Sequence, residues 1–518
     1  MYLTQGLHRS LQLQPERIAT HFRGRYRTYR EFADRVARLA GALQQLGMRP
    51  DDRVSMLALN SDHYLEYMMG VWWGGGVLNP VNIRWSVPEI VYSLDDCDTG
   101  ILVIDDHFLR MAEGIAQRAR RKPVFIYAGE GEVPAGMHGF DALIAATAPV
   151  KDAGRGGNDL AAIMYTGGTT GNPKGVMQSH LNLWASGVQR AADSALVRNS
   201  ITLHAAPLFH TAAMARAVMQ FAAGESHAVI PMFDAREVLE TIEREKVAEL
   251  LLVPTMIQAL LMHPDFGKYD IGSLRRLAYG ASPISAAVLE MAMERMPQVE
   301  FFHAYGLTEA SPVVSVNPPE NHRDEGRRSG RYRSAGKPCF GIHVKVVDEQ
   351  GTEVPRGEVG EVILRGANVM QGYWNKPEET AAVLKKGWLH TGDGAYMDED
   401  GYLFIVDRMK DMIVSGGENV FSAEVENALA RHPAVAMCAV IGVPDERWGE
   451  AVHALVVTRP GASATEDEIR AHCRELIAGY KCPKTVEFRS ELPLSGAGKI
   501  LKKDLRAPFW EGRTRGVN

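Results

Sequence analysis

A short turn rich in glycine, threonine and lysine follows an apolar strand pattern. Residues 165–175 read YTGGTTGNPKG and come directly after the apolar residues 161–164. Glycine lets backbone N–H groups approach phosphate oxygens, threonine hydroxyls add donors, and Lys174 supplies a full positive charge. The turn is not a Walker loop, because Pro173 precedes the lysine and Gly175 follows it where Ser or Thr would stand. The pattern predicts a loop that holds the phosphates of a nucleotide.

The composition of the chain argues against a nucleic-acid partner. The chain has 46% hydrophobic and 23% charged residues, and its formal net charge is -6. Because charges of both signs are interspersed, the broad basic surface that nucleic-acid binding needs is not expected. Basic runs at residues 118–122 and 323–333 are expected to be solvated faces or loops, although either could meet a phosphate or an anionic membrane.

Cysteine usage and apolar runs indicate a compartment. The five cysteines are scattered and form no CxxC pair, which fits a reducing cytosol better than a zinc or redox site. The N-terminal residues contain no apolar core, so a secretory signal is not expected. The longest apolar region, residues 56–83, is interrupted by charged residues and glycines. We predict a cytoplasmic protein without a transmembrane segment; peripheral membrane contact and homo-oligomer formation are left open.

Helices and buried strands alternate along most of the chain. Apolar residues recur at helical spacing over residues 29–46, and short apolar runs at residues 54–59 and 101–104 are typical of strands. This alternation predicts a layered α/β domain. The 518 residues exceed what one hydrophobic core usually supports, so a second, smaller domain is expected.

A charged cluster at residues 407–411 marks the predicted domain boundary. Beyond it, apolar runs at residues 436–440 and 451–457 predict strands, and residues 465–476 predict a helix. We therefore expect an α/β protein with two parts. They are a large multilayer N-terminal domain of mixed sheets and flanking helices, residues 1–406, and a small mobile α+β C-terminal domain, residues 407–518.

Six motifs in a fixed order extend these inferences. They are the turn at 165–175, YGLTE at 305–309, WLHTGD at 388–393, DR at 407–408, GGEN at 416–419 and GK at 498–499. Over nearly the whole chain, the sequence resembles the adenylate-forming superfamily of acyl-CoA synthetases, firefly luciferases and nonribosomal peptide adenylation domains. It is most similar to AMP-forming fatty-acid or aryl-acid CoA ligases. The resemblance implies ATP and CoA as co-substrates and Mg²⁺ as cofactor.

The resemblance also implies a nucleotide site. Glu309, with the Thr166 hydroxyl, would hold Mg²⁺, since one carboxylate plus phosphate oxygens and waters is a usual Mg²⁺ arrangement. Tyr305 would stack on adenine, and Asp393 and Arg408 would bind the ribose hydroxyls. The full implied ATP-binding set is Thr166, Gly167, Gly168, Thr169, Thr170, Gly171, Lys174, Gly280, Ala281, Ser282, Ala304, Tyr305, Gly306, Thr308, Asp393, Arg408 and Lys499.

Catalysis would draw on residues from both parts of the chain. The implied catalytic set is Lys499, Glu309, Lys174 and His210. By resemblance, Lys499 bridges the substrate carboxylate and ATP, where an ammonium offsets charge at the phosphorus. Its neighbours Lys502 and Lys503 are expected to be solvated.

Two chemical steps in one site favour a mobile lid. By resemblance, the C-terminal domain pivots at Asp407. It then presents the CoA-binding loop, Gly416, Gly417 and Glu418, to the pantetheine arm. Glycine there suits close backbone approach to a narrow tunnel.

Small or uncharged residues point to an apolar acyl pocket. The candidates are His210, Met214, Met256, Gly306 and Leu307. The preferred acid is a medium- or long-chain fatty acid, and an aryl acid of the coumarate or ferulate type is the alternative. Two further alternatives are an adenylating enzyme that loads a carrier protein and a non-catalytic nucleotide-binding protein.

Overall fold

The computed structural model of the protein describes most of the chain. The described residues are 1–166, 173–194, 197–282, 284–409, 411–416, 418–496 and 498–511. Six residues of the predicted sites lie outside them: Gly167, Gly168, Thr169, Thr170, Gly171 and Gly417.

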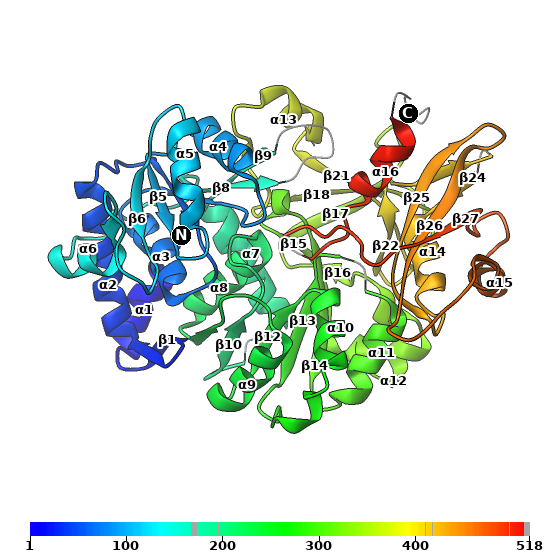
Figure 1. Ribbon diagram of the computed structural model, residues 1–518, viewed down its shortest axis with the longest axis horizontal. Helices are drawn as coiled ribbons and strands as arrows, with labels where there is room; N and C mark the ends of the chain where they lie inside the picture. The colour runs from blue at the N-terminus through cyan, green and yellow to red at the C-terminus, as the bar shows by residue number, and fades with distance from the viewer. Residues whose placement is uncertain are drawn as a thin grey trace.

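Two large sheets form the first part of the molecule (Figure 1). The first has the order β19 (Gly372–Tyr373), β9 (Lys174–Ser179), β8 (Leu160–Thr166), β4 (Val77–Pro80), β3 (Arg53–Leu57), β5 (Ile101–Ile104), β6 (Val124–Tyr127) and β7 (His138–Gly139). The second has the order β16 (Lys337–Pro338), β15 (Val313–Asn317), β14 (Glu300–Gly306), β13 (Arg276–Gly280), β12 (Glu249–Leu252), β10 (Ile201–His204), β11 (Ser226–Val229), β1 (Ile18–Phe22) and β2 (Arg25–Thr28). Both have parallel centres, and antiparallel pairs occur toward the edges, such as β8 with β9 and β14 with β15.

Two smaller sheets follow along the chain. One contains β17 (Ile342–Val347), β18 (Gly360–Gly366), β21 (Trp388–Met397) and β20 (Leu384–Lys385), with β22 (Leu403–Arg408) paired to β21. The other contains β24 (Glu418–Val420), β23 (Ile413–Ser415), β26 (Gly449–Thr458) and β25 (Val435–Asp445), with β27 (Thr485–Phe488) paired to β26. We call residues 411–511 the C-terminal unit.

Helices cover the sheets. In the first part they are α1 (Gln5–Leu13), α2 (Tyr29–Gln45), α3 (Asp62–Trp73), α4 (Val87–Asp96), α5 (Ala112–Arg118), α6 (Phe140–Ala146), α7 (His180–Ser194), α8 (Thr211–Ala223), α9 (Ala235–Glu245), α10 (Pro254–Met262), α11 (Ala286–Arg295), α12 (Asp324–Arg328) and α13 (Pro377–Val383). In the C-terminal unit they are α14 (Ser422–Leu429), α15 (Glu466–Leu476) and α16 (Lys502–Trp510).

Local sequence signals explain several boundaries. The helix expected at residues 29–46 is α2, and Thr28 and Glu31 form a capping box at its start. Thr465 and Glu468 do the same for α15, the helix expected at residues 465–476. The strand expected at residues 101–104 is β5, which is fully buried and lies between β3 and β6. Such strands are continuous apolar runs because both faces are covered.

The C-terminal unit has its own hydrophobic core. Ile413, Val425, Val440, Val452 and Ile469 belong to one buried cluster, which is separate from the clusters of the two large sheets. In Figure 1 this unit lies on the right, and its last loop, in red, runs back toward the centre of the molecule. The boundary predicted between residues 406 and 407 falls inside β22, which still pairs with β21. That boundary stays a prediction.

No helix in the described part of the chain is long and apolar enough to span a bilayer. The apolar region at residues 56–83 instead forms β3, α3 and β4 of the first sheet, and every residue of α3 is buried.

Candidate active site

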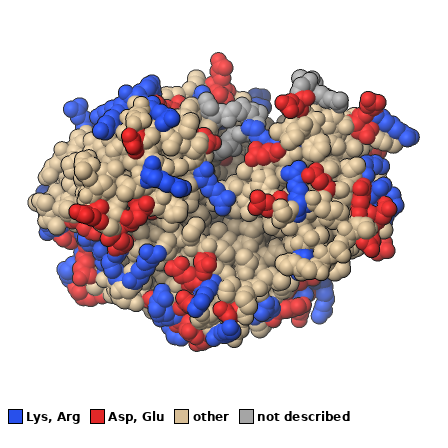
Figure 2. Space-filling view, viewed as in Figure 1, with Lys and Arg blue, Asp and Glu red and all other residues tan. Residues whose placement is uncertain are grey.

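A cavity of about 1910 Å³ lies between the two large sheets and the C-terminal unit. Figure 2 shows the molecule hollowed between its larger left part and the C-terminal unit, with Lys and Arg side chains near the hollow. Its wall includes residues from the ends of β8, β13 and β14, from β21 and β22, and from the loop before α16. Ligands in α/β proteins commonly bind at such carboxyl ends of parallel strands.

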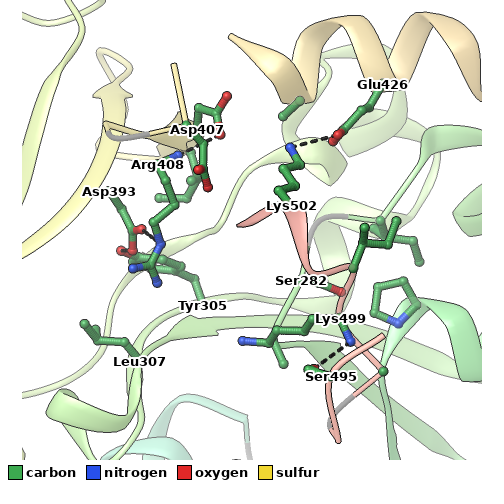
Figure 3. A pocket seen from close by; sticks show the side chains of 18 of the residues that line it. Ser282, Tyr305, Leu307, Asp393, Asp407, Arg408, Glu426, Ser495, Lys499 and Lys502 are labelled. Atoms are coloured by element: carbon green, nitrogen blue, oxygen red, sulfur yellow. Dashed lines mark hydrogen bonds and ion pairs between the residues drawn. The ribbon is translucent and has the colours of Figure 1, made fainter. Parts of the chain in front are cut away.

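One wall of the cavity carries an ion pair between an aspartate and an arginine. Asp393 in β21 and Arg408 in β22 are cross-strand partners, and Arg408 Nε lies 2.6 Å from Asp393 Oδ1. The hydroxyl of Tyr305 donates to Asp393 Oδ2 at 2.6 Å, and Figure 3 shows these three side chains together. Burial opposes a charged Arg408, but Asp393 and the further acidic groups around it together outweigh burial and raise the pKa of the guanidinium. The guanidinium therefore stays charged beside the Asp393 carboxylate.

Glu309 lies on the short turn after β14. The hydroxyl of Tyr373 donates to Glu309 Oε1 at 2.8 Å, and the ammonium of Lys174 lies 5.1 Å from the centre of the Tyr373 ring. Thr166 pairs with Lys174 across β8 and β9, so both phosphate-loop ends reach the same wall. Tyr373 thus contacts both Lys174, through its ring, and Glu309, through its hydroxyl.

The backbone around Glu309 is held tightly. Gln178 Nε2 donates to the carbonyl of Thr308 at 2.7 Å, and Asn368 Nδ2 donates to that of Ala310 at 2.8 Å. A Cβ on Gly306 would lie 1.8 Å from the carbonyl oxygen of Pro312. Only glycine fits this position, because the backbone of the next strand passes so closely.

Lys499 lies on the opposite wall of the same cavity. Its backbone N–H donates to Ser495 Oγ at 3.1 Å, and the turn is closed by Leu494 and Ile500. The residue is exposed to the cavity, yet burial among the walls lowers the pKa of its ammonium below 10.5. Arg408 lowers that pKa further, while Asp393 and Glu309 oppose the shift. The distant parts of the predicted site therefore act on one another here.

His210 sits at the N-terminus of α8 and lines the cavity. Burial and the nearby Lys499 ammonium lower the pKa of His210 to about 3, so the imidazole is neutral at physiological pH. Its Nε2 is buried and has no hydrogen-bond partner among the described residues. A buried donor or acceptor of this kind is usually satisfied by a ligand or water.

Of the other predicted nucleotide-binding residues, most line the cavity and one, Gly280, lies behind the cavity wall. Ala281, Ser282, Ala304, Gly306, Leu307 and Thr308 line the cavity. Gly280 lies behind them in β13, where a Cβ would be 2.2 Å from the carbonyl oxygen of Ala304.

The two predicted pocket methionines are placed elsewhere. Met214 is fully buried in the main core, and Met256 packs against the core beneath α9 and α10. Neither belongs to the cavity wall in the described residues. For Met256 helical spacing explains this, because Thr255 and Gln258 occupy the cavity-facing side of α10.

Asp407 binds the C-terminal unit. Its Oδ2 accepts hydrogen bonds from both the backbone N and the Oγ of Ser422, at 2.6 Å each. Lys502 Nζ donates to the same Ser422 Oγ at 2.6 Å and lies 2.8 Å from Glu426 Oε1. The expectation that Lys502 is solvated was wrong: its side chain is 18% exposed and Glu426 raises its pKa despite burial. Lys503, the next residue, is exposed.

The two described residues of the predicted CoA loop lie away from the cavity wall. Gly416 and Glu418 join β23 to β24, and neither lines the cavity in the described residues. Gly416 has φ +64°, and a Cβ there would lie 2.5 Å from the Trp448 ring. Trp448 is 37% exposed and has Arg447 and Lys484 within 5.6 Å of its ring centre. An exposed indole with two cations can bind a flat base or a phosphate.

Several residues of the site were missed from the sequence. Tyr279 and His303 line the cavity with their rings stacked 5.0 Å apart, and burial lowers the pKa of His303 to about 4. Tyr373 and Gln258 of the cavity wall were missed as well, and so was Trp448, which lies outside that wall beside Gly416. Each lies in a strand, loop or helix without a motif, so only the fold brings it to the site.

Comparisons with known proteins place this geometry in a family. The model of the AMP-binding enzyme family matches residues 7–374, and that of the AMP-binding enzyme C-terminal domain matches residues 424–499. The chain belongs to the AMP-binding enzyme family. The predicted superfamily is thereby confirmed.

Relatives cover almost the whole chain. A feruloyl-CoA synthase from an Amycolatopsis species is 41% identical and covers 97% of this chain and 98% of its own. A fatty acid–acyl-carrier-protein ligase from Streptomyces coeruleorubidus is 37% identical, with coverage of 98% and 96%. This member of the AMP-binding family is an AMP-forming acid–CoA ligase.

A solved structure supports the fold class. The crystal structure of an anthranilate CoA ligase in complex with anthranoyl-AMP superposes with a TM-score of 0.91 and 29% identity, covering 98% of this chain and 97% of that chain. The predicted α/β architecture, with a large N-terminal and a small C-terminal domain, is confirmed.

Proposed function

We propose that this AMP-binding enzyme adenylates an apolar carboxylic acid with the residues of the cavity and then transfers the acyl group to CoA. The observation that carries the proposal is that Lys499, Asp393, Arg408 and Glu309 all line one cavity. These residues come from the C-terminal unit, from β21 and β22, and from the turn after β14. A nucleotide in the cavity would touch all three sources.

Magnesium fits the donor set. Tyr373 fixes Glu309 through Oε1, which leaves the other carboxylate oxygen to face a cation, and the Thr166 hydroxyl lies on the same wall. No cluster of three or more metal-ligating side chains occurs in the described residues, so phosphate oxygens and waters would complete the shell. Bound there, Mg²⁺ would neutralise charge on the phosphates.

The first step joins the acid to AMP. A carboxylate oxygen of the acid attacks the α-phosphorus of ATP, and the bond to pyrophosphate breaks. Asp393 and Arg408 would hold the ribose, Lys174 and Thr308 would contact phosphates, and Lys499 would balance the charge that grows on the phosphorus oxygens. Neutral His210 would border the carboxylate without repelling Lys499.

The second step needs another arrangement. The thiol sulfur of CoA attacks the acyl carbonyl and AMP leaves, so the thiol must reach the place that Lys499 now covers. Gly416 and Glu418 lie outside the cavity wall in this structure, which supports a rotation of the C-terminal unit at Asp407 between the steps. Trp448 beside Gly416 would then contact CoA.

For the acid we propose an arylpropenoic acid of the ferulate type. The support is the 41% identity to a feruloyl-CoA synthase over 97% of the chain, together with a cavity wall that includes Phe209, His210 and Tyr279. Aromatic side chains pack well against a flat ring. This proposal departs from the sequence, which favoured a fatty acid.

A fatty acid is the second candidate, because the Streptomyces coeruleorubidus relative at 37% identity acts on fatty acids. The test is AMP release with CoA and a panel of ferulate, coumarate, decanoate and palmitate. The proposal expects the highest kcat/KM with a hydroxycinnamate. A preference for decanoate or palmitate would reject the aryl acid and leave the two-step reaction standing.

The same relative is a ligase that uses an acyl carrier protein as the acceptor. Parallel assays with free CoA and with a holo-carrier protein separate the two acceptors. We expect thioester formation with CoA, because exposed Trp448 and its two cations suit a nucleotide. Thioester formation with the carrier protein alone would contradict this.

A further inference from the structure

Helix α10 supports the C-terminal unit through two side chains. Gln258 Nε2 donates to the backbone carbonyl of Ala436 at 3.1 Å, and Thr255 Oγ1 donates to that of Gly498 at 3.4 Å. Ala436 is the second residue of β25, and Gly498 immediately precedes Lys499. Because Thr255 and Gln258 are three residues apart, both project from one face of α10. This face therefore contacts the core strand of the C-terminal unit and the loop that carries the lysine.

Gly498 packs closely against the start of α10. A Cβ on Gly498 would lie 3.0 Å from Thr255 Oγ1 and 3.3 Å from Val253 Cγ2, and the residue has φ +75°. A side chain at this position would be strained and would lift the loop from α10. The position of Lys499 consequently depends on the surface that α10 offers.

A third contact holds the other side of the loop. Arg84 Nη1, in the segment after β4, donates to the backbone carbonyl of Leu494 at 3.3 Å. A Cβ on Gly496 would lie 2.7 Å from Asn82 Oδ1. Two segments of the first part of the chain therefore contact the loop before Lys499: the start of α10 and residues 82–84.

We propose that Thr255 and Gln258 are positioning residues that hold the C-terminal unit in the orientation for adenylation. Their acceptors are backbone carbonyls, so the contacts depend on where the C-terminal unit lies and not on its side chains. A rotation that brings the Gly416 loop to the cavity must break them. The segment around Thr255, expected from the sequence to line the acyl pocket, serves here as a dock. This inference rests on the proposed two-step function.

The test compares the two half-reactions in variants that keep the shape of the side chains. Thr255→Val removes the hydroxyl, and Gln258→Glu replaces the donor by a carboxylate that faces a carbonyl. Adenylation is measured by acid-dependent ATP–pyrophosphate exchange, and the second step by thioester formation from prepared feruloyl-adenylate and CoA. We expect each variant to slow exchange about three- to tenfold, and the double variant more, because each removes one hydrogen bond. Thioester formation should be unchanged or faster.

Two variants serve as controls. Thr255→Ser keeps the hydroxyl and should retain exchange within about twofold. Met262→Gln changes an exposed side chain at the end of the same helix and should leave both half-reactions unchanged. Thr255 is not a helix cap, since the N-cap of α10 is Val253 and makes no side-chain cap bond. Loss of the hydroxyl should therefore leave α10 intact.

The outcomes separate this inference from the proposed function. Equal slowing of both half-reactions, or no change in exchange, would overturn the positioning role. Lys499→Ala is measured in parallel. If that variant abolishes exchange while the α10 variants do nothing, the dock is rejected and the lysine role stands. If Lys499→Ala leaves exchange intact, the proposed function itself fails.

Discussion

Asp407 and Arg408 are neighbours in β22, but their side chains bind different parts of the protein. Asp407 Oδ2 accepts from Ser422 at the start of α14, whereas Arg408 Nε lies 2.6 Å from Asp393 in β21. A backbone rotation between the two residues would carry Ser422 away from Asp407 and Arg408 away from Asp393, so it must break both contacts. The two side chains therefore brace the orientation seen here, at the position where the pivot is proposed.

The two side chains should therefore have separable effects. Asp407→Ala leaves the N–H and O–H of Ser422 without their acceptor, which should destabilise the C-terminal unit by about 1–3 kcal/mol. Faster hydrogen exchange at the first amides of α14 would report this, with little change in the KM for ATP. Arg408→Gln is the matched control and should raise the KM for ATP without affecting exchange in α14. Identical effects of both variants would contradict the division.

Lys502 and Lys503 offer a direct test of the buried ion pair. Lys502→Met leaves Glu426 buried without its cation, and we expect a loss of about 2 kcal/mol or more in the free energy of unfolding of the C-terminal unit. Both side chains are under a fifth exposed, at 18% and 19%. Lys503→Met alters an exposed residue and should change the stability by less than about 0.5 kcal/mol. Chemical denaturation followed by exchange within α14 and α16 measures both, and similar losses would rule out the pair as the cause.

Sequence patterns predicted the fold best where local and global signals agree. β5 coincides with the apolar run at residues 101–104, and the capping residues Thr28 and Thr465 define the starts of α2 and α15. The β22 strand was harder. Its charged end, Asp407 and Arg408, suggested a domain boundary, yet these residues still pair with Gly394 and Asp393 of β21.

Contacts between distant segments could not be predicted. Nothing in the residues around Lys502 indicates that Glu426 and Ser422 lie beside it, so a lysine near the end of the chain looked solvated. The same is true of Gln258 and Ala436, which are 178 residues apart in sequence. Motif residues such as Asp393 and Glu309, which line the cavity, could be named from the sequence because the resemblance supplied the fold that unites them.

The lowered pKa of Lys499 predicts the basic limb of the pH profile. A lysine loses its charge as pH rises, and burial moves this loss below pH 10.5 in the free enzyme. The profile of kcat/KM for ATP in pyrophosphate exchange reports the free enzyme. As the pH rises, kcat/KM should therefore begin to decrease before pH 10.5 is reached. Lys499→Arg, which stays charged, should retain some activity and lose this limb. A limb that persists in Lys499→Arg would assign it to another group.

His210, in contrast, should contribute no limb to the pH profile. Since its pKa is lowered to about 3, it does not titrate between pH 5 and 8. His210→Asn should reduce the rate of exchange about tenfold or more by altering the carboxylate border, without moving either limb of the profile. The disappearance of an acid limb near pH 6.5 in this variant would show that the imidazole titrates in the working enzyme.

Trp448 is expected to act only in the second step. Trp448→Ala removes the exposed indole beside Gly416 and should raise the KM for CoA about tenfold, the size of a lost base-stacking contact. Pyrophosphate exchange should stay unchanged, because Trp448 is not part of the cavity wall in the described residues. Phe340→Ala, which alters another exposed aromatic residue, is the control. An equal effect on exchange would remove Trp448 from the CoA site.

Buried histidines predict acid sensitivity of the first part of the molecule. His204 Nε2 lies 3.0 Å from His227 Nδ1 between β10 and β11, and burial lowers the pKa of His204 to about 3. The unfolded chain binds this proton near pH 6.5 while the folded chain does not, so stability falls as pH drops below about 6.5. Between pH 7.5 and 5.0 this one group should remove about 2 kcal/mol from the free energy of unfolding. In urea titrations at the two pH values, His204→Gln should lose correspondingly less stability on acidification, whereas His107→Gln, at an exposed site, should match the parent chain. An unchanged pH dependence in His204→Gln would show that other groups cause the acid sensitivity.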